Sequence, residues 1–491
     1  MQTARTQYPV LAEVRYSDTG DTSVVQLPFN SISSAHEELR RIAEDVLHLH
    51  IDLSGRDIPA EDLARLFQLD FSKMTHLCIV ADPPADDFED LIRPWCTQQW
   101  PVEYSPITAI DPEDRFRLYD PPPFVYAHFL HGLNTWIALE RIELRFFLHV
   151  PSVDKDHLPA AELDVCDWVL AKHDNLRTVI VDDVPHRIQL LMGYLYIPVD
   201  VDVQLTTTNI TRTFEIGMLE EMLPAQPVGA RGARILDTAV HVHVEVGRNR
   251  LLVCGKLSWD ERDNRQLVLE ARPAPIRGTL DSHTTLGAYL SHVLRSAATV
   301  FDPSEVSFLR IVGDVTWISA KDWMNLMRPF RNVETLCMND NSCGRYESIR
   351  AICEALADHT YDIPRGLEEP IFPHLRQLHI TGVEFLQSDV DNLYQVLEIR
   401  KNRGRPVTRC LYKVHARGKV AVRQLKEAVK TLSTVVKDVE LSTLMPQSNG
   451  AVKIVTYYPP DRAPRGRTKC KPTVVVRLLL PGASKQYSHC Q

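Results

Sequence analysis

The sequence of 491 residues lacks the features that mark several large classes of protein. No run of about 18 apolar residues occurs, so we expect no membrane-spanning helix. The first residues, Met1 to Val10, lack the apolar segment of a secretory signal peptide. The 10 cysteines include no pair with C-x-x-C spacing, which is typical of a reducing compartment rather than of a disulfide framework. We therefore expect a protein of the cytoplasm or nucleus.

The chain also lacks an excess of basic residues and the short motifs of common enzymes. Lys and Arg total 55 against 64 Asp and Glu, and the net charge of −9 argues against a dedicated nucleic-acid binder. The G-x-G-x-x-G, G-x-x-x-x-G-K-[ST], G-x-S-x-G and H-E-x-x-H motifs are absent, and the glycines of residues 229–232 match neither phosphate-loop spacing. We therefore expect no enzymatic activity and no cofactor.

What the chain does contain is one short phrase that recurs. Its clearest copy runs from Pro373 to Ile380, where apolar residues follow the pattern Leu-x-x-Leu-x-Ile. Further copies run from Asn332 to Met338, from Ser72 to Ile79 and from Asn175 to Val181. Each copy follows a helix-like stretch. This order of elements is typical of leucine-rich repeats, which stack their units into a solenoid.

The helix-strand units are clearest from Ser319 onward. Ser319 is predicted to cap a helix that Pro329 ends, and a strand around Leu336 follows. The same order predicts a helix with an apolar stripe over 349–356 before the strand at 375–380. It also predicts a helix from Ser388 or Asp389 to Gly404 before a strand at 410–414. Weaker apolar helical stripes precede four earlier predicted strands, at Leu77, Leu144, Val181 and Ile311.

The spacing of these units divides the chain into three regions. Residues 1–36 are expected to form a strand and loop segment, and 448–491 a basic, proline-containing tail or cap. Residues 37–447 are expected to form an irregular solenoid, clearest at 319–441. Between 201 and 280 strands dominate, which fits either degenerate repeats or a β insertion. The predicted fold class is α/β: a curved leucine-rich-repeat solenoid with parallel strands on its concave face and helices on its convex face.

Several phrases of the last third follow one another in a characteristic order. Between Phe330 and Leu441 these are Phe372 to Leu378, Gly382 to Phe385, Arg400 to Gly404 and Val436 to Glu440. In this order they resemble the C-terminal repeat region of the F-box-like proteins of mushroom-forming (basidiomycete) fungi. The segment from Glu38 to Leu53 resembles the one that usually follows the F-box. The resemblance implies a repeat region that binds proteins.

The F-box itself departs from the family pattern. An F-box is a three-helix module that opens with Leu-Pro-x-Glu, whereas Leu27-Pro28 is followed here by Phe29-Asn30. The family implies docking to a Skp adaptor of a cullin-type ubiquitin ligase. We favour a protein-binding scaffold without an F-box. The alternative is a substrate-recognition adaptor of such a ligase, with a diverged F-box and a Skp adaptor as its partner.

Paired histidines are the best candidates for a metal site. His241 and His243 share one face of a predicted strand, as do His48 and His50, because strand side chains alternate. A metal site needs a third ligand, which the sequence does not nominate. We therefore expect no metal and interpret these residues as partly exposed strand histidines. The alternative from another class is an enzyme with a metal-dependent site at His241 and His243.

Candidate protein-binding residues come from the positions between the apolar residues of the strands. By strand alternation we expect them to face the concave surface; they are Glu334, Thr335, Arg376, Gln377 and His379. Trp95 and Trp100 flank a polar loop and are candidate binding anchors. Cys78 and Cys337 hold matching places in the repeated phrase, and we expect them to behave as buried apolar residues.

Overall fold

The computed structural model describes nineteen parts of the chain. They are residues 10–18, 21–28, 32–54, 60–81, 124–147, 171–183, 185–198, 200–209, 219, 222–223, 235–247, 250–258, 265–273, 283–340, 349–357, 371–415, 420–446, 452–457 and 474–479. The chain forms two compact units. Unit 1 comprises 1–234 and 264–276, and unit 2 comprises 235–263 and 277–491. Among the described residues, no helix combines the length and the apolar character that a bilayer crossing requires.

Unit 1 is an α/β unit with a mostly parallel sheet. Its strands are β1 (Val10–Asp18), β2 (Asp21–Pro28), β3 (Val46–Asp52), β4 (His76–Val80), β5 (Arg141–Arg145), β7 (Thr178–Asp182), β9 (Asp202–Asn209) and β12 (Gln266–Pro273). They lie in the order β2-β1-β3-β4-β5-β7-β9-β12, parallel from β3 onward, with β1 antiparallel to both of its neighbours. The helices are α1 (Ile32–Ile42), the 3-10 turn η1 (Ala43–Asp45), α2 (Ala60–Phe67), α5 (Phe124–Thr135) and α6 (Pro185–Tyr194). A separate parallel pair joins β6 (Ala171–Lys172) to β8 (Leu195–Tyr196).

Unit 2 repeats this plan. Its strands are β10 (His241–Val246), β11 (Leu251–Lys256), β13 (Phe308–Gly313), β14 (Thr335–Asp340), β15 (Gln377–Glu384), β16 (Arg409–His415), β17 (Asp438–Pro446), β18 (Val452–Tyr457) and β19 (Val474–Leu479). They lie in the order β11-β10-β13-β14-β15-β16-β17-β18-β19, parallel from β10 to β17 and antiparallel at both ends. The helices are α7 (Ile235–Thr238), α8 (His283–Val300), the 3-10 turn η7 (Val315–Trp317), α9 (Ala320–Met327), α10 (Arg350–Ala357), α11 (Gln387–Asn402) and α12 (Val420–Leu432). The α/β class expected from the sequence is confirmed in both units.

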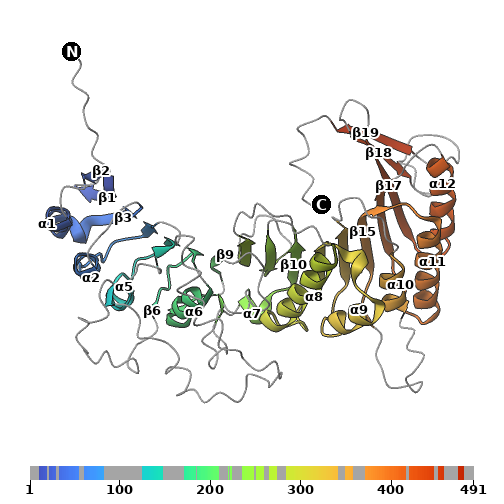
Figure 1. Cartoon of the computed structure of the whole chain (residues 1–491), viewed down its shortest axis with the longest axis horizontal. Coiled ribbons are helices and arrows are strands. Elements are labelled where there is room, and N and C mark those ends of the chain that lie inside the picture. Colours follow the sequence, from blue (N-terminus) through green and yellow to red (C-terminus); the bar gives the residue numbers. More distant parts are fainter. Residues whose placement is uncertain are drawn as a thin grey trace, which may run out of the picture. The chain divides into compact units, whose positions relative to one another are not determined.

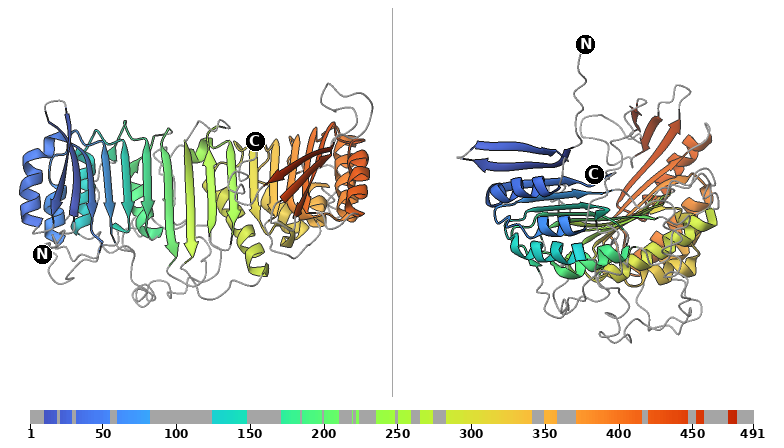
Figure 2. Two further views of the ribbon diagram at one scale, coloured as in Figure 1. Left: turned by 90° about the horizontal axis from the view of Figure 1, so that it is seen from above. Right: turned by 60° about the vertical axis from the view of Figure 1, so that its left-hand side comes forward.

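Within each unit the helices lie on one face of the sheet (Figures 1 and 2). Each strand places buried apolar residues on that face, and the strand register aligns them in rows. In unit 2 one such row consists of Val242, Leu309, Leu336, Leu378, Cys410 and Val439. In unit 1 the matching row consists of Leu49, Leu77, Ile142, Val179, Val203 and Leu267. The second leucine of each recurrent phrase therefore lies in the core.

The helices of the clearest units lie where the sequence predicts, although α11 begins at Gln387 and not at Ser388 or Asp389. The Ser319 hydroxyl accepts a hydrogen bond from the amide of Asp322 at 3.2 Å and caps α9. Trp323 of that helix is fully buried. Gly404 follows α11 with φ of +73°, the left-handed conformation expected of a C-terminal glycine. The helical stripe predicted before Val181 lies outside the described residues.

Aromatic side chains fill the core of unit 1. Trp136, which is 0% exposed, lies at ring-centroid distances of 5.8–6.2 Å from Phe67, Phe71 and Phe129. Its indole Nε1 donates a hydrogen bond to the carbonyl of Leu69 at 3.2 Å. The ring therefore combines a large buried apolar area with a satisfied polar atom, which is how a buried tryptophan is normally accommodated.

The segment that enters β15 is held by a buried arginine. Arg400 of α11, which is 4% exposed, donates hydrogen bonds to the carbonyls of Ile371 at 3.1 Å and Phe372 at 2.6 Å. Phe372 has φ of +49°, a conformation that L residues rarely adopt. The guanidinium therefore fixes a strained turn a few residues before the strand.

A bulge interrupts β15 near its end. The pairing with β16 shifts between Thr381 and Val383, and Gly382 lies between them with φ of +85°. A Cβ atom at Gly382 would lie 2.0 Å from the carbonyl oxygen of Asp340 on β14. Only glycine fits this position, because both its backbone conformation and the close approach of β14 exclude a side chain.

Candidate functional site

The strand residues that alternate with the core residues of unit 2 lie on the opposite side of its sheet, which we call the second face. Strand register aligns them in rows that cross the sheet. The central row consists of His243, Arg310, Cys337, His379, Leu411 and Glu440. The row on one side consists of Lys256, His241, Phe308, Thr335, Gln377, Arg409 and Asp438. The row on the other side includes Glu245, Val312, Asn339, Thr381 and Lys413. Each strand therefore contributes one side chain to each row.

Three of the predicted contact residues lie on this second face. Thr335 and Gln377 are neighbours in one row, and His379 lies in the central row. Glu334 and Arg376 are exposed and lie one residue before β14 and β15. Adjacent strand residues point to opposite sides, so Arg376 and Gln377 do not share a face.

Glu334 and Arg376 take part in the sheet through their backbone carbonyls instead. The Glu334 carbonyl accepts hydrogen bonds from the amides of Arg376 at 2.8 Å and Gln377 at 3.0 Å. The Arg376 carbonyl likewise accepts from Thr408 at 2.8 Å and Arg409 at 3.1 Å. These bonds start each new strand beside the previous one. The other two candidates, Trp95 and Trp100, lie outside the described residues.

Cys337 and His379 make the closest contact between two potentially reactive groups among the described residues of this face. The Cys337 Sγ atom lies 3.1 Å from Nδ1 of His379. Burial and the neighbouring charges of Arg409 and Lys413 lower the pKa of His379 to about 4. The imidazole is therefore neutral near pH 7, and its ring nitrogen can accept a hydrogen bond from the thiol.

The expectation that both cysteines of the repeated phrase are buried is confirmed for Cys337 and wrong for Cys78. Cys337 is 4% exposed, but it lies on the second face beside an imidazole, not among the apolar residues of the helix-covered core. Cys78 of unit 1 is only partly buried and lies on the face of β4 opposite Leu77 and Ile79. Because side chains alternate along a strand, the residue after the core leucine always faces away from the helices.

His241 and His243 lie near the start of the second face, on β10. Burial, followed by the charges of Lys256 and Arg310, lowers the pKa of His241 to about 4. Burial and then the charge of Arg310 lower that of His243 to about 3. In the parts of the chain that the structure describes, no group of three or more His, Cys, Asp or Glu residues is placed to bind a metal ion.

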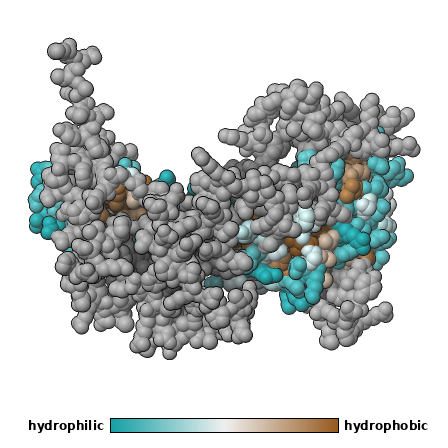
Figure 3. Space-filling view, in the orientation of Figure 1, coloured by the Kyte–Doolittle hydropathy of each residue, from teal (hydrophilic) through white to brown (hydrophobic). Residues whose placement is uncertain are grey.

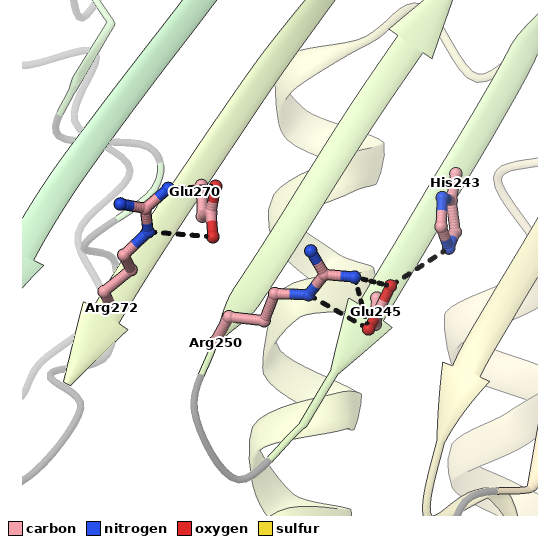
Figure 4. Close-up of polar contacts among 5 residues, drawn as sticks. All are labelled: His243, Glu245, Arg250, Glu270 and Arg272. Carbon is pink, nitrogen blue, oxygen red and sulfur yellow. Dashed lines mark hydrogen bonds and ion pairs between the residues drawn. The ribbon is translucent and has the colours of Figure 1, made fainter. Parts of the chain in front are cut away.

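A polar chain continues from His243 to the turn after β10. His243 Nε2 lies 3.7 Å from Oε2 of Glu245 (Figure 4). The guanidinium of Arg250 binds both carboxylate oxygens of Glu245, with distances of 2.7–3.0 Å. The negative charge of Glu245 is thus matched by Arg250, which leaves the imidazole of His243 neutral beside it.

Positive charge predominates on the second face between β11 and β16. Lys256, Arg310, Arg409 and Lys413 lie there, and their effect is visible in the lowered pKa values of His241, His243 and His379. The described carboxylates on these strands are Glu245, which pairs with Arg250, Asp340, which ends β14 and is 8% exposed, and Glu384 at the end of β15. Asp438 and Glu440 follow on β17. The basic strip is therefore bounded by acidic residues on the next strand.

The corresponding face of unit 1 carries ion pairs between neighbouring residues. On β5 the guanidinium groups of Arg141 and Arg145 lie 3.1 Å and 2.6 Å from the carboxylate of Glu143. Burial alone would raise the pKa of Glu143, but hydrogen bonds from the two arginines outweigh it and lower the pKa. On β12 Arg272 binds Glu270 at 3.1 Å (Figure 4). The cations of this face are thus largely neutralised by carboxylates of their own strand.

Several residues of the second face were not identified from the sequence. Arg310 and Lys413 each stand between buried residues of a strand, as His379 does between Leu378 and Ile380, and Lys256 ends β11. The same alternation would have identified them. Their grouping could not have been found in this way, because it depends on which strands are neighbours.

No protein-family model matches the chain, and the comparison with curated proteins gives no significant match.

Proposed function

We propose that this chain is a non-enzymatic protein-binding scaffold whose second face in unit 2 binds a partner protein. One observation carries the proposal: strand residues, most of them polar, form registered rows on the face of the sheet opposite the helices. Parallel sheets usually have helices on both faces and buried residues throughout. A sheet with polar rows on one face has the composition of a surface that another molecule contacts.

The proposal includes an architecture, an irregular leucine-rich-repeat solenoid. The repeated phrase supports it, because its leucines fill the core row by row while the intervening residues form the second face. The resemblance of residues 330–441 to the repeat region of the F-box-like fungal proteins supports it independently. Solenoids of this kind bind partners along an extended surface.

The proposed scaffold works without an F-box. Residues 10–18 and 21–28 form strands β1 and β2; β1 pairs with both β2 and β3. An F-box requires three helices, and the described residues of this segment form the single helix α1 only after the two strands. This arrangement favours the scaffold over the ligase adaptor.

Proximity labelling with a matched pair of variants tests the proposal. Gln377→Trp places a bulky side chain on the second face, where Gln377 is partly exposed on β15. Gln395→Trp makes the same substitution at an exposed position of α11. The full chain, fused to a labelling enzyme, would be expressed at equal levels in three forms: unmodified, Gln377→Trp and Gln395→Trp.

We expect a reproducible set of labelled proteins that Gln377→Trp depletes and Gln395→Trp preserves. Circular dichroism of the purified variants checks that both remain folded. Equal labelling by all three forms would refute a role for the second face in partner binding. Depletion by Gln395→Trp instead would assign binding to the helical side.

A further inference from the structure

The second face of unit 2 has a charge that distinguishes it from the rest of the chain. The whole chain carries a net charge of −9. Between β11 and β16, however, the face carries Lys256, Arg310, Arg409 and Lys413, and its carboxylate at Glu245 is bound by Arg250. The other described carboxylates of these strands are Asp340, which ends β14 and is 8% exposed, and Glu384. A basic strip in an acidic protein attracts anionic ligands and repels cationic ones.

The cations are spread out rather than gathered at one point. Lys256, Arg310 and Arg409 belong to β11, β13 and β16, so five strand intervals separate the first from the last. Neighbouring strands lie about 4.8 Å apart, which gives a strip of roughly 24 Å. This length exceeds a single phosphate or carboxylate and matches about seven residues of an extended peptide.

We propose that the second face of unit 2 binds an extended acidic peptide segment of a partner protein, lying across strands β11 to β16. Its carboxylates pair with Lys256, Arg310, Arg409 and Lys413. The inference rests on the proposed function and specifies the chemistry of the partner. The segment carries acidic residues about four positions apart, because β13 and β16 are separated by about 14 Å.

The neutral histidines of the strip fit this ligand. His243 and His379 lie in the central row between the cations, and both keep lowered pKa values because of burial and of those cations. Neutral imidazoles offer hydrogen bonds to backbone groups of a peptide without adding charge. A bound carboxylate would offset the field of Arg409 and Lys413 and raise the pKa of His379.

A peptide fits the strip better than a nucleic acid does. Proteins that bind single-stranded nucleic acids stack bases on exposed aromatic rings. Phe308 is the aromatic residue in the described rows of this strip, and it is 7% exposed with its ring packed against His241 at 4.2 Å. The carboxylates of Asp438 and Glu440 beside the strip also oppose a continuous phosphate backbone.

Fluorescence anisotropy with the full chain tests the inference. The probe is a labelled 12-residue peptide of Glu-Ala-Ser-Gly repeats, whose glutamates lie four residues apart. The comparison probes are the same peptide with Gln for Glu and a 12-nucleotide oligothymidylate. The test variant is the double charge reversal Arg409→Glu and Lys413→Glu. The matched control is Lys426→Glu and Lys430→Glu, which changes the net charge equally at two exposed positions of α12.

We expect the Glu peptide to bind at least about tenfold more tightly than the Gln peptide at low salt, since several exposed ion pairs together contribute on the order of 1.4 kcal/mol. The test variant should abolish this difference and the α12 control should retain it. If the reversed pair does not fold, Arg409→Gln with Lys413→Gln serves instead. Equal binding of the Glu and Gln peptides, or equal loss in the α12 control, would overturn the inference. So would tighter binding of the oligothymidylate.

The same variants separate this inference from the proposed function. A set of labelled proteins that Gln377→Trp depletes but the Arg409 and Lys413 reversal leaves unchanged would retain the scaffold and refute the acidic ligand. Labelling that neither variant changes would refute the scaffold itself.

Discussion

The buried side chain of Arg400 should be essential for the segment that leads into β15. Its guanidinium donates to the carbonyls of Ile371 and Phe372. In Arg400→Met the Phe372 carbonyl keeps the amide of Leu375 at 3.1 Å, whereas the buried Ile371 carbonyl loses its arginine donor. An unsatisfied buried carbonyl costs about 1–3 kcal/mol, and a hydrogen bond from a charged donor contributes about 1.5–3 kcal/mol. The substitution also removes the free-energy cost of burying a charged guanidinium, which offsets part of this loss. We therefore expect a net destabilisation of about 2–4 kcal/mol.

Hydrogen exchange followed by mass spectrometry measures this effect locally, which a two-unit chain requires. We expect the amides of β15 to exchange at least about 30-fold faster in Arg400→Met, since 1.4 kcal/mol corresponds to a factor of ten. Arg403→Met is the matched control, because Arg403 caps the C-terminus of the same helix, is exposed and donates a longer bond of 3.5 Å to the carbonyl of Ala357. Equal exchange in the two variants would show that Arg400 does not hold this segment.

Three further variants test the stability of unit 2, each measured by urea unfolding. Burial and nearby cations lower the pKa of His379 to about 4. Because its folded pKa lies below its unfolded pKa of about 6.5, this histidine contributes its full stabilisation above about pH 6.5. As the pH falls from about 6.5 toward the folded pKa, the free energy of unfolding drops by about 1.4 kcal/mol per pH unit. His379→Gln should therefore flatten the dependence of stability on pH between these limits, and an unchanged dependence would contradict this. Gly382→Ala should destabilise unit 2 by at least about 2 kcal/mol, because residue 382 has φ of +85° and the added Cβ would lie 2.0 Å from a carbonyl oxygen of β14. A neutral effect would disprove this close approach. Ser319→Ala should cost about 1 kcal/mol by removing the acceptor for the Asp322 amide, whereas Ser319→Asp should preserve the cap.

Local elements of unit 2 were predictable because their signals are local. The cap at Ser319, the apolar stripe of α9 and the left-handed glycine at Gly404 all depend on residues within a few positions of one another. Strand alternation likewise placed Gln377 and His379 on one face. These signals predict single helices and strands. Neither an apolar stripe on a helix nor the alternation of side chains along a strand specifies which strand will be the neighbour in the sheet.

Contacts between strands were not predictable from these signals. The approach of Cys337 to His379 requires β14 and β15 to pair in one particular register. The left-handed turn at Phe372 was missed because it is imposed by Arg400, a residue 28 positions away, and not by a local preference. The basic strip was missed for the same reason, as its members come from three different strands.

The division of the chain between its two units constrains the order in which they can form during synthesis. Strand β12 completes the sheet of unit 1 beside β9, yet it follows β10 and β11, which belong to unit 2. A ribosome therefore exposes the first two strands of unit 2 before it supplies the last strand of unit 1. From β13 to β19, by contrast, each new strand pairs with the one made immediately before it. We expect folding on the ribosome to pause until residues 266–273 emerge and then to proceed strand by strand. A fragment cut at 234 would lack β12 and so leave the edge of β9 unprotected.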